Sequence, residues 1–245
     1  MTAIMNVNKL PKAFRNFLDA NEHTTGGAEI SVTTLIDSPQ IRYLQKIHEE
    51  EMEEDISNGV MAMLGTAVHN ILETNAPPED IVEARLHATV DDMTVSGQID
   101  RIYPLEDDDE IASWEDLDVG IQDWKTCRGS ALVINPGGDL SWEWQLNAYA
   151  FLARQNGYNV KELKVGALVR DWSASQMRRN MRFPKSPWME IDIPMWDPDV
   201  AENFIKERVR LHQMETPPPC SNKERWMGKH IYAVHPFKLK GGLAK

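Results

Sequence analysis

Two side chains of opposite charge, Asp123 and Lys125, stand two residues apart at the end of a short apolar segment. Side chains at this spacing on a β-strand project from the same face. The carboxylate of Asp123 would there bind a hard cation, and the ammonium of Lys125 would stabilise negative charge on a phosphate or an attacking water. An Asp and a Lys at this spacing also form simple salt bridges, so the pair alone leaves both interpretations open.

A second carboxylate, Asp100, ends the sequence Gly-Gln-Ile-Asp that begins at Gly97, one predicted strand before Asp123. If the two strands are neighbours, the two carboxylates come close together and repel each other unless they are protonated or bind a metal ion. A divalent cation would remove this cost. The alternative interpretation is that Asp100 ends a strand as a cap or pairs with Arg101.

His69 lies four residues after Gly65 and four before Glu73, on one face of a predicted helix. One imidazole nitrogen would bind a metal ion, while Glu73 or a backbone carbonyl orients the other nitrogen. Gly65 would allow a second backbone to approach the helix. Gln145 and Tyr149 are also four residues apart on a predicted helix. For His69 and Tyr149 alone, a packed side chain is the simpler interpretation.

These residues need a scaffold, and the apolar pattern predicts one. Helices are expected over 41–54, 60–73, 142–156 and 199–213, with Gly157 closing the third. Strands are expected over 81–90, 93–103, 119–125, 160–169 and 191–194, and a loop over 129–141. We expect a flexible N-terminal segment at 1–30 and a single domain at 31–245 with a C-terminal tail at 214–245. The pattern predicts an α/β fold with a central mixed β-sheet flanked by helices.

The charge distribution restricts which part of the surface could bind nucleic acid. Its net charge of −12 argues against binding nucleic acid over its whole surface. The acidic runs at 49–55 and 106–110 are expected to be solvated. The stretch 170–185 is basic, because it contains one acid, Asp171, and five bases: Arg170, Arg178, Arg179, Arg182 and Lys185. Any surface that binds DNA is therefore local.

Two further features restrict the location and the cofactors. No apolar run approaches the roughly 20 residues of a membrane span, and residues 1–21 lack the layout of a signal peptide. We therefore expect a cytoplasmic protein with no membrane partner. The two cysteines, Cys127 and Cys220, are too few for an iron–sulfur or zinc site built from four thiolates.

Taken in order, these motifs resemble the PD-(D/E)XK nuclease superfamily, and within it the RecB-like exonuclease branch of phage recombination and bacterial repair. The pattern is Gly-x-x-x-His-x-x-x-Glu at 65–73, Gly-x-x-Asp at 97–100, Asp-x-Lys at 123–125 and Gln-x-x-x-Tyr at 145–149. Each motif is weak alone, but four in this order on the expected elements are specific. The resemblance covers about 31–158 and implies a core like that of restriction endonucleases.

The resemblance implies a metal-dependent DNA exonuclease. One or two Mg²⁺ or Mn²⁺ ions would be held by His69, Asp100, Asp123 and the Trp124 carbonyl. Catalysis would rest on Asp100, Asp123, Lys125 and Glu83, an acidic strand position before the Gly-x-x-Asp motif. Supporting or DNA-contacting roles would fall to Gln145, Tyr149, Glu73, Arg170, Arg178, Arg179 and Arg182. The metal ion and Lys125 would activate a water for in-line attack on a phosphodiester.

The same resemblance bears on cofactors and partners. Some RecB-like relatives bind a [4Fe–4S] cluster through four cysteines, whereas here only Cys220 stands in the corresponding region. We therefore expect no iron–sulfur cluster, and we expect the tail at 217–226 to dock against the N-terminal segment. The implied partner is single- or double-stranded DNA, engaged at its ends, in a bacterial cell. A recombination partner protein and a homo-oligomer stay open.

Two other functions compete with the nuclease. The first is a catalytically inactive DNA- or protein-binding module on a nuclease fold, which would grip its partner through 170–185. An inactive copy has no chemical need for Asp100, Asp123 and Lys125 together. The second is an acidic inhibitor that mimics DNA, for which carboxylates would suffice without His69 or Lys125.

Overall fold

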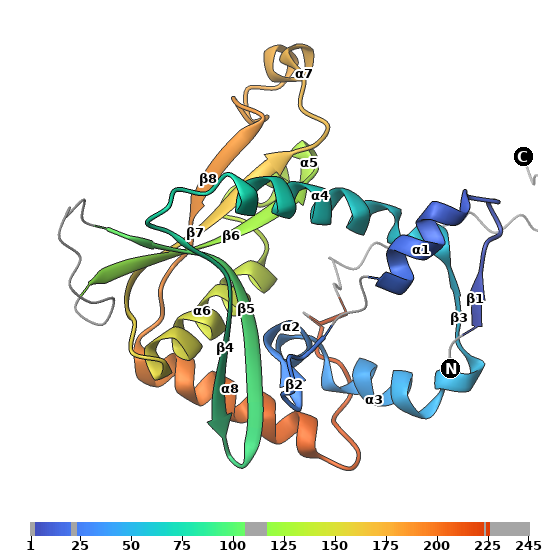
Figure 1. Cartoon of the computed structure of the whole chain (residues 1–245), viewed down its shortest axis with the longest axis vertical. Helices are drawn as coiled ribbons and strands as arrows, with labels where there is room; N and C mark the ends of the chain where they lie inside the picture. Colours follow the sequence, from blue (N-terminus) through green and yellow to red (C-terminus); the bar gives the residue numbers. More distant parts are fainter. Residues whose placement is uncertain (1–2, 21–23, 106–116, 223, 226–245) are drawn as a thin grey trace, which may run out of the picture.

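A six-stranded mixed sheet forms the centre of the molecule in this computed structural model, which describes residues 3–20, 24–105, 117–222 and 224–225 (Figure 1). Its strand order is β2 (Ile30–Ser31), β5 (Met93–Pro104), β6 (Asp118–Cys127), β7 (Asn159–Val169) and β8 (Trp188–Asp192), with β4 (Ile81–Val90) paired to β5. The β2–β5 and β6–β7 pairs are parallel, and the other pairs are antiparallel. The predicted mixed sheet is therefore confirmed.

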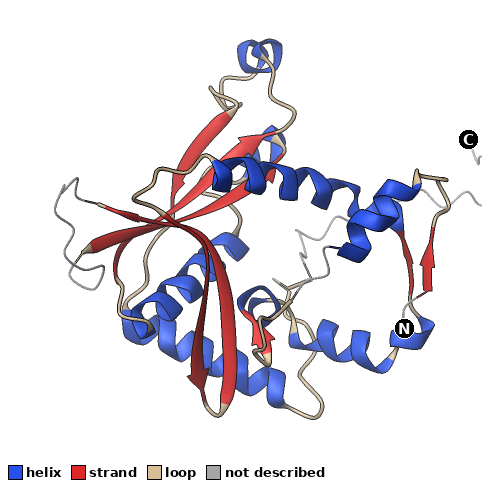
Figure 2. Ribbon diagram, viewed as in Figure 1, coloured by secondary structure: helices blue, strands red, loops and turns tan. Residues whose placement is uncertain are grey.

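The helices that cover the sheet are α6 (Leu140–Gln155), α8 (Pro198–Gln213), α4 (Val60–Thr74) and α2 (Val32–Ile36). Helix α6 packs against β4, β5, β6 and β7 on one side and against α8 on another, as Figure 2 shows. Nine consecutive residues of α6, Gln145–Ala153, are buried, as expected for a helix enclosed by other elements. The helix ends at Gln155, and Gly157, two residues later, has a φ of 90°, which allows the closing turn that the sequence predicted.

A close approach between β5 and α6 depends on Gly97. A Cβ atom on this residue would lie 2.8 Å from Cε1 of Tyr149 and 2.8 Å from Cδ1 of Leu152. Only a residue without a side chain fits there. This contact holds Tyr149 and Leu152 of α6 against β5, three residues before Asp100 on that strand.

The remaining elements lie mostly to the right of the sheet in Figure 1. They are β1 (Ala3–Met5), α1 (Lys12–Ala20), α3 (Pro39–Ile47), the short 3₁₀ helices η1 (Glu49–Glu51) and η2 (Ile56–Gly59), and β3 (Glu53–Asp55). Strands β1 and β3 form a separate parallel pair. Within residues 1–30, for which we expected a flexible segment, the described part thus contains a strand and a helix. Two more helices, α5 (Gly129–Ile134) and α7 (Ala174–Arg179), lie near β8 in Figure 1.

Two predictions of secondary structure were wrong. The helix expected over 41–54 ends at Ile47, because residues 53–55 instead form β3, which pairs with β1. The loop expected over 129–141 contains α5, which forms because Leu132 is buried in the core. The acidic run at 106–110 lies outside the described residues. No helix in the described part of the chain is long and apolar enough to cross a bilayer.

Candidate active site

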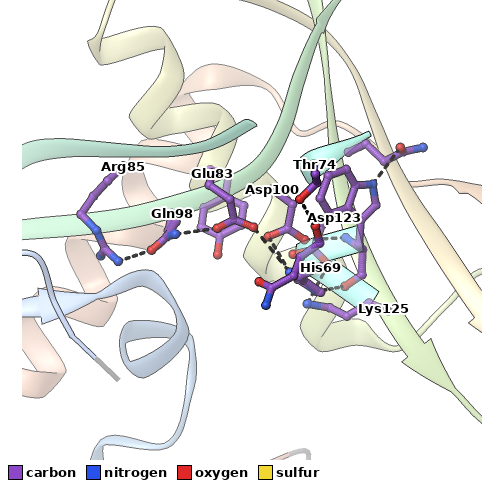
Figure 3. Close-up of polar contacts among 12 residues, drawn as sticks. His69, Thr74, Glu83, Arg85, Gln98, Asp100, Asp123 and Lys125 are labelled. Atoms are coloured by element: carbon purple, nitrogen blue, oxygen red, sulfur yellow. Dashed lines mark hydrogen bonds and ion pairs between the residues drawn. The ribbon is translucent and has the colours of Figure 1, made fainter. Parts of the chain in front are cut away.

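Three potential metal ligands from three elements meet in one cluster, shown in Figure 3. They are His69 on α4, Glu83 on β4 and Asp100 on β5, and their ligand atoms lie within 4.8 Å of one another. Nδ1 of His69 lies 3.7 Å from Oε1 of Glu83 and 3.6 Å from Oδ1 of Asp100. The cluster borders an open cleft of about 460 Å³, which is lined by Gly65, Thr66, His69, Asn70, Glu73, Glu83 and Gln98.

The main chain of Trp124 joins two members of this cluster. Its carbonyl oxygen lies 2.8 Å from Nε2 of His69, and its N–H donates a 2.6 Å hydrogen bond to Oδ2 of Asp100. The indole ring meets the imidazole edge-on, with ring centroids 5.8 Å apart. Of the two groups expected to orient His69, the backbone carbonyl is therefore the one in contact, whereas Glu73 is exposed on the rim of the cleft.

A second polar chain lies next to the cluster and connects β6 to α6. Nζ of Lys125 lies 2.6 Å from Oδ2 of Asp123 and donates a 3.0 Å hydrogen bond to Oε1 of Gln145. Nε2 of Gln145 in turn donates to the hydroxyl of Tyr149 at 2.8 Å. Gln145 and Tyr149 are both buried, so these contacts favour a role in holding Lys125 over direct contact with DNA.

The donor set fits a divalent cation. Oδ2 of Asp123 is buried. Its contact with Lys125 is an ion pair without hydrogen-bond geometry, so this oxygen has no hydrogen-bond donor among the described residues. The Lys125 ammonium offsets part of the charge of this buried carboxylate, and a divalent cation would also offset the repulsion between Asp123 and Asp100. Carboxylates with one imidazole suit Mg²⁺ or Mn²⁺, and the imidazole favours the transition ion. Asp123 itself lies outside the three-residue cluster, and Glu83 lies within it.

The charges in the cluster shift the pKa values of two members. Burial lowers the pKa of His69, but Glu83 and Asp100 outweigh burial and raise it to about 9. Burial and the nearby charge of Asp123 raise the pKa of Asp100 to about 7. The charge of Asp123 thus disfavours ionisation of Asp100, and the two carboxylates repel each other when both are ionised.

Glu83 has an unusual backbone for a strand residue. Its φ of 51° lies in the left-handed region, which costs a non-glycine residue about 1–3 kcal/mol. Both of its strand neighbours, Val82 and Ala84, pair with β5, whereas Glu83 itself is left out of the register. The regular pairing is thus interrupted where its side chain joins the cluster, and strained backbone of this kind is frequent at functional sites.

The structure also decides between several simpler interpretations. Arg101 pairs with Asp80 at 2.5 Å and not with Asp100, so Asp100 is free to face His69. The close approach expected at Gly65 is wrong, because a Cβ atom there would meet nothing nearer than Oγ1 of Thr126 at 3.9 Å. The tail was expected to dock against the N-terminal segment at 1–30, but the N–H of Cys220 donates to Oε1 of Gln40 on α3 at 2.6 Å. Trp226 lies outside the described residues.

The predicted arginines lie away from the cluster's contacts. Arg178, Arg179 and Arg182 are exposed on and after α7, the tip of the connection between β7 and β8 (Figure 1). Arg170 is also exposed, at the end of β7, where it contacts Sδ of Met61 at 2.9 Å.

One site residue was not predicted from the sequence: Gln98, which donates to Oε2 of Glu83 at 2.5 Å. Its place inside the Gly-x-x-Asp motif, two residues before Asp100, was the available signal.

Comparison with known proteins identifies the family. No curated protein sequence matches the chain. A solved structure described as the crystal structure of SSO0001 resembles this chain with 18% identity and a TM-score of 0.48, over 84% of each chain. The family model of the PD-(D/E)XK nuclease superfamily matches residues 75–215, which is more than half of the chain. This segment contains Glu83, Asp100, Asp123 and Lys125, whereas His69 precedes it. The chain therefore belongs to the PD-(D/E)XK nuclease superfamily.

Proposed function

We propose that the chain is a metal-dependent deoxyribonuclease that hydrolyses phosphodiester bonds as an exonuclease of the RecB-like branch. One observation carries the proposal. The cluster of His69, Glu83 and Asp100 stands beside the Asp123–Lys125 pair, whose buried carboxylate oxygen has no hydrogen-bond donor in the described part of the chain. Membership in the superfamily supports the reaction class.

The side chains of the site have different roles in the proposed reaction. His69, Glu83, Asp100 and Asp123, with the Trp124 carbonyl, would hold one or two Mg²⁺ or Mn²⁺ ions. A bound divalent ion would supply a Lewis acid, lower the pKa of a water and offset charge on the phosphate. Lys125 stabilises the charge that develops as water oxygen bonds to phosphorus and the bond to the leaving oxygen breaks. Gln145 fixes the Lys125 ammonium through the 3.0 Å hydrogen bond, and Tyr149 fixes Gln145.

DNA would reach the site through a local basic surface. The exposed side chains of Arg170, Arg178, Arg179 and Arg182 offer positive charge on a protein whose net charge is −12. Phosphate contacts from arginine position a duplex or single strand without reading its sequence. We further propose a role at DNA ends in phage or bacterial recombination or repair in the cytoplasm, with residues 31–245 as one domain.

A digestion assay tests the proposal. Wild-type protein is incubated with closed circular DNA and with end-labelled linear DNA, single- and double-stranded, in Mg²⁺ or Mn²⁺. An exonuclease releases label from linear DNA and leaves the closed circles intact, and Asp123→Asn abolishes the release. Cleavage of the circles would show an endonuclease. Intact DNA under every condition, together with retarded mobility in a gel, would instead support the inactive DNA-binding module.

A further inference from the structure

A row of polar side chains extends from the cluster along β4 and β5. Arg85 and Gln98 are direct partners across the two strands. Glu83 precedes Arg85 by two residues, and Asp100 follows Gln98 by two. Residues opposite each other, and residues two apart, share one face of an antiparallel pair. The row therefore leads from Arg85 and Gln98 directly to Glu83 and Asp100, as Figure 3 shows.

Hydrogen bonds in this row have a fixed direction. Nε2 of Gln98 donates to Oε2 of Glu83 at 2.5 Å, and Oε1 of Gln98 accepts from an Nη atom of Arg85. Arginine can only donate, so the amide oxygen must face Arg85 and the amide nitrogen must face Glu83. This arrangement occupies one carboxylate oxygen of Glu83 and leaves the other, Oε1, facing His69.

The far end of the row is held by the loop Thr24–Gly27. The Thr24 carbonyl accepts from the other Nη atom of Arg85 at 3.2 Å, and the Thr25 carbonyl accepts from Oγ of Ser96 at 2.5 Å. Gly26 has a φ of 62°, and a Cβ atom there would lie 2.2 Å from Cδ of Arg85. The loop can therefore hold the Arg85 side chain in this position only because residue 26 is a glycine.

We propose that Gln98 is a positioning residue for the metal site, aligned by Arg85 and the loop Thr24–Gly27. It fixes the Glu83 carboxylate so that Oε1 is presented to the His69–Asp100 cluster. A free glutamate side chain has several rotatable bonds, and restricting them before the ion arrives removes part of the entropic cost of binding. The inference rests on the proposed function only in that the cluster binds a divalent cation.

Mn²⁺ affinity of the full chain without DNA, measured by isothermal titration calorimetry, tests this coupling. Gln98→Met retains the length of the side chain and removes both hydrogen bonds. We expect it to weaken Mn²⁺ binding roughly tenfold, the usual scale for groups that orient metal ligands. In a Glu83→Gln background the same substitution should change the affinity less than about twofold, because Gln98 acts through Glu83. A merely structural role would weaken binding equally in both backgrounds.

Two further variants complete the design. Gly26→Ala should displace Arg85 and weaken Mn²⁺ binding in the same direction as Gln98→Met. Gln45→Met, at an exposed position of α3, is the matched control and should bind Mn²⁺ as the wild type does. Equal losses in both Glu83 backgrounds, or no loss in either, would overturn the proposal. Wild-type protein that shows the coupling but cleaves no DNA would refute the nuclease function and leave the positioning role standing.

Discussion

The ammonium of Lys125 lies 2.6 Å from a buried oxygen of Asp123 that receives no hydrogen bond from any described residue. The Asp123 side chain is almost fully buried, whereas the Lys125 side chain is about a quarter exposed. The carboxylate thus carries most of the desolvation cost, and it also repels Asp100. Stability is therefore lower here than an uncharged side chain would allow.

Asp123→Asn should stabilise the metal-free protein and abolish its activity. The substitution removes a buried charge and its repulsion with Asp100, so we expect the Tm without metal to rise by about 2–4 °C, which corresponds to about 1 kcal/mol for a chain of this size. Activity should fall at least about 100-fold, because even groups that only orient ligands reach that scale. Thermal melts in EDTA and initial rates on linear DNA measure the two effects. A lower Tm would show that the ion pair stabilises the fold.

Metal affinity should rise with pH. His69, with a pKa raised to about 9, and Asp100, with a pKa raised to about 7, both lose protons when a cation binds. Between pH 7 and 9 the Mn²⁺ affinity should rise by about tenfold per unit, because one proton, that of His69, is displaced. Below pH 7 the rise should be steeper, because Asp100 also releases a proton. Calorimetry in buffers of different ionisation enthalpy counts these protons.

The same pKa shift has a consequence for the metal-free fold. The charged form of His69 is favoured in the folded state, so its stabilising contribution is fully present below the unfolded pKa of 6.5 and is lost as pH rises through about 9. His69→Asn should remove both this pH dependence and the rise of affinity between pH 7 and 9. An unchanged affinity profile in that variant would assign the proton to another group.

Two glycines near the site should respond to alanine in opposite ways. Gly97→Ala would bring a Cβ atom to 2.8 Å from Tyr149 and Leu152, and we expect a loss of about 1–3 kcal/mol from overpacking. Gly65→Ala is the matched control, since its nearest neighbour would be 3.9 Å away. It should stabilise α4 by about 0.5–1 kcal/mol. Chemical denaturation of both variants provides the comparison, and equal effects would contradict the close packing of β5 on α6.

The arginines around α7 should determine how DNA binding depends on salt. Replacing Arg178, Arg179 and Arg182 by glutamine removes three exposed charges, so the slope of log K against log salt should decrease by up to about 3. Fluorescence anisotropy at several salt concentrations measures the slope. Arg210→Gln on α8, which removes one exposed charge already paired with Glu207, should leave it unchanged. An unaltered slope in the triple variant would move the DNA-binding surface elsewhere.

Periodic patterns predicted much of the scaffold. The helix carrying His69 and the strands carrying Glu83, Asp100 and Asp123 were expected close to where they occur, because each has a clear apolar face or run. The strand pairing that brings Asp100 next to Trp124 followed from the ordered motifs and not from spacing alone. Residues 49–55 were predicted poorly, because β3 forms through pairing with β1, some 50 residues earlier.

The finer arrangement of the site could not be predicted for a similar reason. The left-handed backbone at Glu83 depends on how β4 pairs with β5, which no local pattern reveals. The role of Gln98 depends on a partner across the strand and on a loop more than 70 residues earlier in the chain. Contacts made between distant segments are invisible to periodicity, whereas the residue types of the metal ligands are visible directly.

The backbone at Glu83 also matters for protein engineering. A left-handed φ suits glycine or asparagine better than glutamate. Glu83→Asn would relieve this conformation and remove one acidic ligand in a single substitution. Residue 83 is therefore a position at which one substitution would both stabilise the protein and inactivate it. Such a variant would be useful for trapping the protein with intact DNA.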